Sequence, residues 1–221
     1  MIILVLIIIT ISLSLWSLGS FLAVRNLEQP QYSIVQKEGA FELRQYDSYI
    51  VAQVEVKGEY DQALRQGFSL VASYIFGDNS KNVKIPMTSP VLGGEVEPES
   101  EKIEMTVPVI DTADSGSRTV SFVMPSKYTL DTLPKPRNPA VTFRQVPSRT
   151  VAVLRYTFYT NAARIENKKQ ELRAILETKN MQSVGTYSSA LYNPPLSMPL
   201  LLRNEVLVDV GEIPQDHSTV K

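Results

Sequence analysis

The first 24 residues form one apolar run that contains no charged side chain. A helix of about 20 residues is enough to cross a bilayer. A cleaved signal peptide is the alternative, but such a peptide normally begins with basic residues and has a shorter apolar stretch. No Lys or Arg precedes this run, although Ser17-Leu18-Gly19 is an acceptable cleavage site. We therefore expect residues 1–24 to be an uncleaved transmembrane anchor, with a polar linker over 25–33.

The charges that follow this run give little information on orientation. Arg25 is soon balanced by Glu28, so the excess of basic residues that marks a cytoplasmic flank is slight. We expect a single-pass membrane protein, and of the two sides we favour the extracytoplasmic one for the folded part.

Beyond the linker the apolar pattern first alternates and then changes period. Ile50, Ala52, Val54 and Val56 are apolar at every second position, which is typical of a half-buried strand. Over residues 59–76 the apolar positions recur at spacings of three and four, as on one face of a helix that ends near Gly77. The predicted stripe of this helix comprises Tyr60, Leu64, Phe68, Val71 and Ile75.

The same order of strand and helix occurs a second time, one hundred residues later. Residues 41–56 align with residues 141–156, so that Arg44 matches Arg144 and Val51 matches Val151. A second helix follows, with Asn161 as its N-cap, and alternating segments follow each helix. We predict two fused β-α-β-β units related by a pseudo-two-fold axis. They form one domain over residues 34–213, and residues 214–221 form a flexible tail.

One octapeptide is written twice. KIPMTSPV at 84–91 returns eighteen positions later as KIEMTVPV at 102–109. Proline has no N–H to donate, so we expect these segments to be edge strands or to lie at a bulge. Met87 and Met105 are expected to fill gaps in the core, as flexible thioethers do. Contact with a ligand or a metal centre is the alternative.

Composition removes several kinds of site. The chain has no cysteine, which excludes disulfides, thiolate nucleophiles and Cys-ligated metals. A net charge of −1 gives no sign of the basic surface that nucleic-acid binding requires. The single histidine, His217, lies in the predicted tail, so neither a Ser-His-Asp system nor a zinc site is expected. The acidic run over 95–101 does not fit a calcium loop. We expect no enzyme and no metal site.

Together these motifs resemble the SOUL haem-binding family over residues 31–210. The resemblance is carried by FELRQYDSYIVAQVEV, by YDQALRQGFSLVASYIFGDN, by the doubled Met-Thr-x-Pro-Val, by SFVMPSKYTLDTLPKPRNP and by YNPPLSMPLLLRNEVLV. It implies an α+β fold, namely a distorted antiparallel β-barrel made from the two repeats with two helices. It also implies non-enzymatic binding of haem or another tetrapyrrole in an apolar cleft beside the first of these helices.

The resemblance further implies which residues line that cleft. Arg65 matches the family's basic residue and is suited to pair with a propionate. Ser73 and Ser197 stand where relatives carry basic residues, so propionates would be held less firmly. With no histidine available, Tyr74, Tyr192 and Met198 are the candidates for contact with the iron. The expected cleft residues are Arg65, Phe68, Val71 and Ala72 on the helix, with Tyr192, Pro194, Leu196 and Met198 on a late loop.

Two other functions remain open at this point. The same scaffold could serve as a small-molecule sensor or a protein-interaction module, since a fold does not fix a function. It could also be an enzyme acting on a tetrapyrrole-like substrate. The sequence does not identify protein partners.

Overall fold

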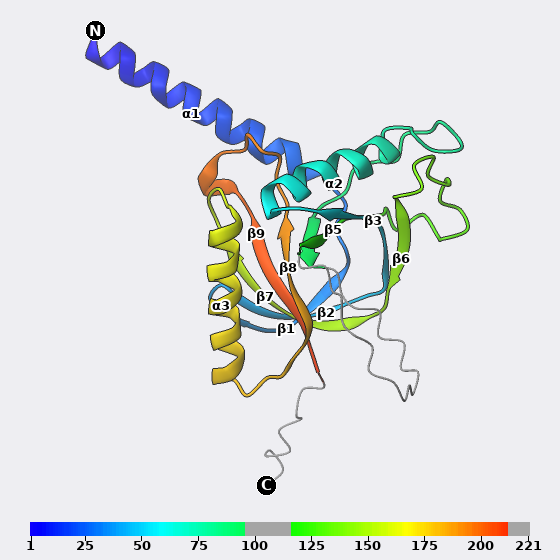
Figure 1. The fold of residues 1–221 in the computed structure, drawn as a ribbon. Helices are drawn as coiled ribbons and strands as arrows, with labels where there is room; N and C mark the ends of the chain where they lie inside the picture. Colours follow the sequence, from blue (N-terminus) through cyan, green and yellow to red (C-terminus); the bar gives the residue numbers. More distant parts are fainter. Residues whose placement is uncertain (96–115, 212–221) are drawn as a thin grey trace, which may run out of the picture.

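A computed structural model describes residues 1–95 and 116–211 and combines helices with a single β-sheet (Figure 1). The helices are α1 (Ile2–Arg25), α2 (Tyr60–Ile75), α3 (Ala162–Thr178) and the short 3-10 helix η1 (Pro199–Leu201). The strands are β1 (Tyr32–Glu38), β2 (Phe41–Tyr46), β3 (Tyr49–Lys57), β4 (Val91–Glu95), β5 (Ser117–Val123), β6 (Thr142–Val146), β7 (Arg149–Tyr156), β8 (Ser183–Leu191) and β9 (Asn204–Val210).

The nine strands pair in the order β1-β2-β7-β9-β8-β4-β5-β3-β6, and every pairing between neighbours is antiparallel. The two ends of this order, β1 and β6, do not pair with each other within the described residues. The sheet is therefore not closed, and the expected barrel is not confirmed. The α+β class and the antiparallel sheet are as predicted.

Strand pairing connects the two halves of the chain in a reciprocal way. Arg44 pairs with Val151 across β2 and β7, and Val51 pairs with Arg144 across β3 and β6. A shift of one hundred residues exchanges these two pairs. When β2–β5 are exchanged for β6–β9, the strand order from β2 to β6 becomes its own reverse, as a two-fold relation requires. The pattern is consistent with two related units, while their equivalence in three dimensions stays a prediction.

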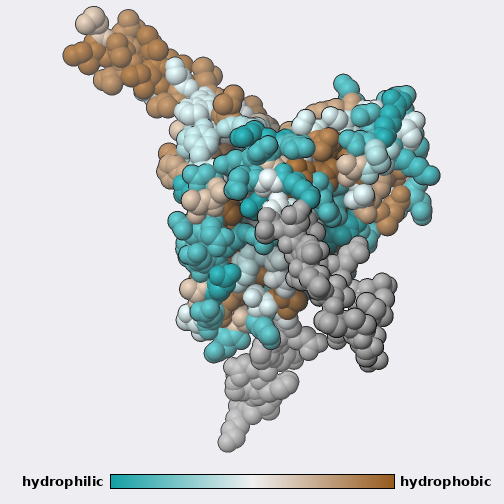
Figure 2. All heavy atoms as spheres, in the orientation of Figure 1, coloured by the Kyte–Doolittle hydropathy of each residue, from teal (hydrophilic) through white to brown (hydrophobic). Residues whose placement is uncertain are grey.

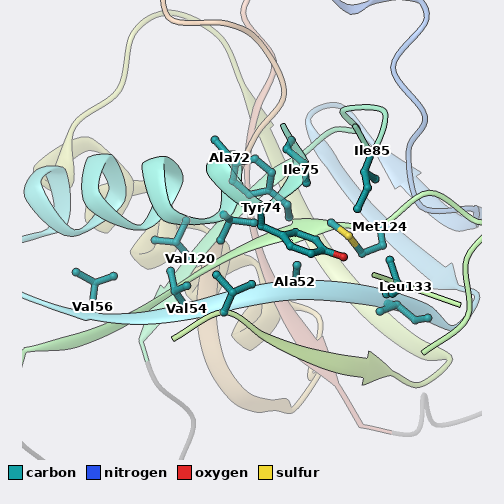
Figure 3. Packing of buried hydrophobic residues seen from close by; sticks show 14 of the residues in the cluster. Ala52, Val54, Val56, Ala72, Tyr74, Ile75, Ile85, Val120, Met124 and Leu133 are labelled. Carbon is teal, nitrogen blue, oxygen red and sulfur yellow. The ribbon is translucent and has the colours of Figure 1, made fainter. Parts of the chain in front are cut away.

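Alternation along the strands gives the sheet two different faces. The face that we call the helix face packs against α2 and α3 and carries most of the aliphatic core, part of which is shown in Figure 3. On the opposite face tyrosines and ion pairs stand beside smaller apolar residues. Along β2, for example, Leu43 faces the helices, whereas Arg44 and Tyr46 lie on the opposite face.

Helix α2 begins and ends as the sequence predicts, and most of its predicted stripe faces the core, including Tyr60, Val71 and Ile75. Gly67 lies so close to β5 that a methyl group on its Cα would stand 2.6 Å from Cβ of Val120. Val71 and Tyr74 continue this buried line. Phe68, predicted to lie in the stripe, stays partly exposed, and its ring centroid lies 5.1 Å from that of Phe122. Helix α3 has the predicted N-cap, because the Asn161 side chain accepts a hydrogen bond from the Arg164 N–H.

The first proline-containing octapeptide is not a strand, which corrects the sequence prediction. Residues 84–90 run as irregular chain into β4, and Thr88 makes the segment's one bridge, to Glu28. The two prolines lack the donors that a ladder needs. Met87 packs against the core cluster, as expected. The second octapeptide with Met105, and the tail with His217, lie outside the described residues.

Helix α1 is long and apolar enough to cross a membrane, a test that a signal sequence near the N-terminus also passes. Its outer part projects away from the domain as a hydrophobic rod (Figure 2). Most of its large apolar side chains are exposed, and Ser20 is its one buried residue.

Candidate functional site

The four residues predicted on α2 divide into two exposed and two buried positions. Arg65 and Phe68 lie on the outer surface, and the Phe68 side chain is 38% exposed. Val71 and Ala72 belong to the core cluster, with Val71 fully covered. A ligand would contact Val71 only if the core moved. The exposed line continues to Phe76, one turn beyond Ala72, so that a cation and two aromatic rings follow one another along the outer side of the helix.

The four residues predicted on the late loop also differ in their surroundings. Tyr192 is buried on the opposite face of the sheet, where its hydroxyl donates to Glu205. Pro194 is exposed, and Leu196 is 85% exposed, while Met198 is half-buried. The hydrogen bonds made by residues 194–202 go to one another, to α1 and to the segment 158–159, and among the described residues none joins this loop to α2. That the helix residues and the loop residues line one cleft stays a prediction.

A cavity with a volume of about 430 Å³ lies elsewhere in the domain. It is enclosed by the linker before β1, the turn between β2 and β3, and residues 123–130 after β5. Tyr49, Tyr128 and Leu130 supply apolar surface. A volume of this order is within the range of small-molecule sites. None of the eight predicted residues lines it.

The charges of this cavity do not match a tetrapyrrole with carboxylate side chains. Glu28 and Asp47 line it, and no Lys or Arg is among its described lining residues. The Glu28 carboxylate accepts a hydrogen bond of 2.7 Å from the Ser126 N–H. A propionate in this cavity would meet negative charge without a cation to offset it. The cavity therefore fits an anionic porphyrin less well than the outer side of α2, where Arg65 is available.

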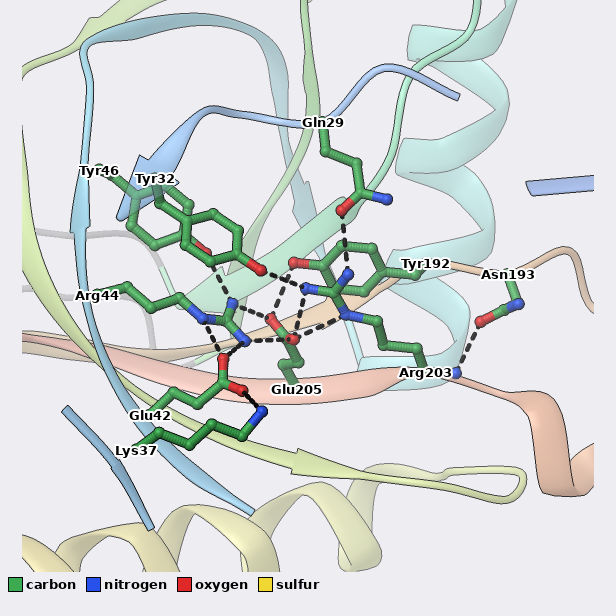
Figure 4. A network of polar contacts seen from close by, with 10 residues as sticks. All are labelled: Gln29, Tyr32, Lys37, Glu42, Arg44, Tyr46, Tyr192, Asn193, Arg203 and Glu205. Atoms are coloured by element: carbon green, nitrogen blue, oxygen red, sulfur yellow. Dashed lines mark hydrogen bonds and ion pairs between the residues drawn. The ribbon is translucent and has the colours of Figure 1, made fainter. Parts of the chain in front are cut away.

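An ion-pair network, which the sequence analysis did not predict, occupies the opposite face of the sheet (Figure 4). The Arg44 guanidinium donates to Glu42, to Glu205 and to the Tyr46 hydroxyl. Arg203 donates to Glu205 from the other side. The alternation of FELRQY places Glu42 and Arg44 on a polar face, which normally indicates exposure to solvent. Here both side chains are buried, because Glu205 on β9 pairs with Arg44, and Arg44 and Lys37 pair with Glu42.

The network keeps its carboxylate ionised and its tyrosines neutral. Burial alone would raise the pKa of Glu205, but hydrogen bonds and charge from Arg44 and Arg203 outweigh burial and hold that pKa below its ordinary value. Burial and then the charge of Glu205 raise the pKa of Tyr192 well above its ordinary value. Burial raises the pKa of Tyr46 to about 12. These groups are fixed in place and are poorly suited to proton transfer near neutral pH.

The candidate iron ligands can be tested in the same way. The hydroxyl of Tyr74 donates to the Pro134 carbonyl and that of Tyr192 to Glu205, and burial raises both phenol pKa values. Neither phenol is free to become a phenolate ligand. Met198 is the partly exposed candidate. Among residues 1–95 and 116–211 no group of three His, Cys, Asp or Glu side chains is placed to hold a metal ion.

Comparison with known proteins gives a family match over most of the chain. The family model described as SOUL heme-binding protein matches residues 27–209. Human heme-binding protein 2 is 31% identical over 172 residues, covering 76% of this chain and 77% of that protein. Heme-binding protein 1 of Xenopus laevis is 28% identical over 185 residues, covering 83% of this chain and 90% of that protein.

Solved structures share the fold at low sequence identity. The C-terminal domain of EcmrR superposes with a TM-score of 0.53 at 9% identity, covering 82% of this chain and 99% of that domain. A hydrolase from Listeria innocua superposes with a TM-score of 0.50 at 12% identity, covering 80% of this chain and 94% of that protein. At these identities the similarity is one of architecture alone.

Proposed function

This chain belongs to the SOUL haem-binding family, and from that premise we propose that it binds haem or another tetrapyrrole as a ligand without transforming it. The observation that carries the proposal is the family match over residues 27–209, which includes the described sheet except its last residue, Val210, and both of its covering helices. The relatives named as heme-binding proteins support a bound ligand rather than a catalytic cofactor. The buried ionisable groups support it as well, because they are held in fixed pairs.

We place the ring on the outer side of α2. Phe68 and Phe76 give exposed aromatic surface on either side of Ala72, and Arg65 lies one turn before Phe68. A flat macrocycle laid along this line would cover apolar area, worth roughly 25 cal/mol per Å², and a propionate could reach Arg65. An exposed ion pair adds about 1 kcal/mol or less. Apolar contact should therefore dominate the affinity.

The residues predicted on the late loop form the second proposed wall of the site. Pro194, Leu196 and Met198 offer apolar surface, and hydrogen bonds join the loop backbone at Leu196 and Met198 to α1. The Tyr192 hydroxyl is engaged with Glu205, while its side chain lines a small cavity. Variants at Leu196 test whether this loop contributes to the site.

Hemin titration tests the α2 site. The full chain is placed in nanodiscs, and the Soret band is followed with empty nanodiscs as the blank. We expect micromolar-class affinity, about −8 kcal/mol. Phe68→Asp should weaken binding tenfold or more, Arg65→Ala about fivefold at most, and His217→Ala not at all.

Leu130→Asp is the matched control, because Leu130 is an exposed apolar residue that lines the 430 Å³ cavity. Loss of hemin binding in Leu130→Asp, with Phe68→Asp unaffected, would move the ring from α2 to the cavity. A Soret band that decays steadily into product absorbance would refute the non-enzymatic part of the proposal.

We also propose that α1 tethers the protein to a membrane as a single-pass anchor. The support is a helix of 24 residues with no charge before Arg25. Full-length protein should stay with membranes during alkaline carbonate extraction. A shortened soluble species would show instead that residues 1–24 are a cleaved signal peptide.

A further inference from the structure

Helix α1 is attached to the domain along its side, well before its C-terminal end. The indole N–H of Trp16 donates to the Leu196 carbonyl at 2.9 Å. One turn later the Met198 N–H donates to the Ser20 hydroxyl at 2.8 Å, and that hydroxyl donates to the Trp16 carbonyl. The loop around η1 therefore lies beside the helix at the level of Trp16.

This attachment point determines how deep the loop lies if α1 crosses a bilayer. Residues 2–16 rise by only about 22 Å at 1.5 Å per residue. The hydrocarbon core is about 30 Å thick, so this part of the helix is about 8 Å too short to span it. For the N-terminus to reach the far headgroups, the loop beside Trp16 must enter the near side of the membrane by a similar depth.

The surface at this level is apolar. We call the exposed residues around it the apolar collar, which consists of Phe158, Tyr159, Leu196, Leu200 and Leu201. They come from two loops that hydrogen bonds join, since the Phe158 N–H donates to the Pro199 carbonyl and the Tyr159 hydroxyl to the Ser197 carbonyl. Figure 1 shows η1 and its loop, in orange, at the edge of the domain from which α1 departs.

The collar is built at a conformational cost. Phe158 has φ = 68°, a left-handed backbone that is rare for a bulky residue. Arg164 holds this turn, because its guanidinium donates to the carbonyls of Thr157 and Tyr159. Strained residues persist where the surroundings over-determine them, often at functional surfaces. Phe158 and Tyr159 beside Arg164 form a combination that suits the membrane interface, where aromatic and basic side chains contact lipid headgroups.

We propose that the apolar collar inserts into the interface of a phospholipid bilayer beside α1 and seats the domain directly on the lipid. The inference rests on the proposed membrane tether and adds a second contact to it. Its occupant is the bilayer, because the collar is continuous with the one helix of the described chain that is suited to lipid. Amphipathic elements typically enter by about 5–10 Å, which agrees with the missing length of about 8 Å.

The absence of cysteine allows a direct test on the full chain. A single cysteine at Leu200 or Leu196 is labelled with an environment-sensitive NBD fluorophore, and the protein is reconstituted into phosphatidylcholine–phosphatidylglycerol vesicles. Leu130→Cys is the matched control, since Leu130 is also an exposed leucine but lies on the 430 Å³ cavity. Circular dichroism confirms that each variant is folded.

The proposal predicts blue-shifted emission at positions 196 and 200, quenching by nitroxide lipids labelled near the carbonyls, and at least tenfold slower reduction by dithionite than at position 130. Labels at 196 and 200 that react as fast as the one at 130, on protein that resists carbonate extraction, would overturn the collar and leave the tether intact. Protein that does not stay with vesicles at all would overturn both. Quenching of the 196 label by hemin, with no response to nitroxide lipid, would assign the loop to the tetrapyrrole and refute insertion.

Discussion

Arg44 and Glu205 form a two-pronged ion pair, with Nη1–Oε2 and Nη2–Oε1 distances of 2.9 Å and no exposed surface on either side chain. Removing one partner leaves a buried charge without compensation, which costs about 3–5 kcal/mol. We therefore expect Arg44→Met to lower the free energy of unfolding by that amount, as measured by urea denaturation of the full chain in mild detergent.

Arg144 provides the matched control for this measurement. It lies one hundred residues after Arg44, is exposed, and donates to Gln53 instead of entering an ion-pair network. Arg144→Met should change the free energy of unfolding by about 0.5 kcal/mol at most. Equal losses of unfolding free energy in the two variants would show that the buried ion pair stabilises the fold no more than an exposed arginine does.

Acid should destabilise the protein through the same network. The pKa of Glu205 lies below its ordinary value of 4.5 in the folded state, so the unfolded chain binds a proton first as the pH falls. The contribution of Glu205 should be complete above about pH 4.5 and should be lost as the pH drops through the lowered folded pKa. Between pH 7 and pH 3, urea denaturation should show a smaller loss of unfolding free energy in Glu205→Gln than in the unmodified protein. Some loss should remain in the variant, because the pKa of Glu42 is also lowered. An identical pH dependence in both proteins would contradict this assignment.

Gly67→Ala should destabilise the protein, although alanine normally favours a helix by about 1 kcal/mol. The new methyl group would stand 2.6 Å from Cβ of Val120, so α2 or β5 must shift, at a cost of about 1–3 kcal/mol. Thermal unfolding of Gly67→Ala should occur at a lower temperature, whereas Ser69→Ala, on the exposed side of the helix, should not. In a double-mutant cycle, Val120→Ala should relieve part of the loss, and strict additivity would argue against the close contact.

Tyr192→Phe separates a structural role from a role in ligand binding. The buried Glu205 would lose a donor, which should lower the free energy of unfolding by about 1–3 kcal/mol. The hemin spectrum should stay unchanged, because this hydroxyl is already engaged and the pKa of the phenol is raised. A shifted Soret band in the variant would identify Tyr192 as an iron ligand after all.

The helices could be predicted from the sequence because their signals are local. The spacing of apolar residues and the Asn161 cap are read within a few positions, and both helices occur where expected. The outward position of Phe68 could not be predicted in the same way. Its neighbour Gly67 meets Val120 of β5, a contact that the sequence does not encode locally. Phe68 is therefore partly exposed, whereas Val71 of the same predicted stripe is buried.

The site was harder to predict than the fold for a related reason. The composition of KIPMTSPV suggested an extended strand, but a strand also needs donors and a neighbour, and the two prolines remove the donors. The burial of Arg44 could not be read locally either, because its partner Glu205 comes from the last strand of the chain. The 430 Å³ cavity is lined by residues from five separate places in the sequence between Glu28 and Gln145, so no single motif predicts it.

The open sheet has a consequence for behaviour at high concentration. Within the described residues β1 has one free edge, and Ile34 and Val35 on that strand are exposed, which is a template for strand addition by another chain. The pairing with β2 slips at Val35, between Ile34 and Gln36, and such a bulge twists an edge out of register. Lys37 and Glu38 then place charge at the end of the strand. At the β1 edge, protection against strand addition thus rests on a five-residue stretch, where loss of one residue would restore a regular edge.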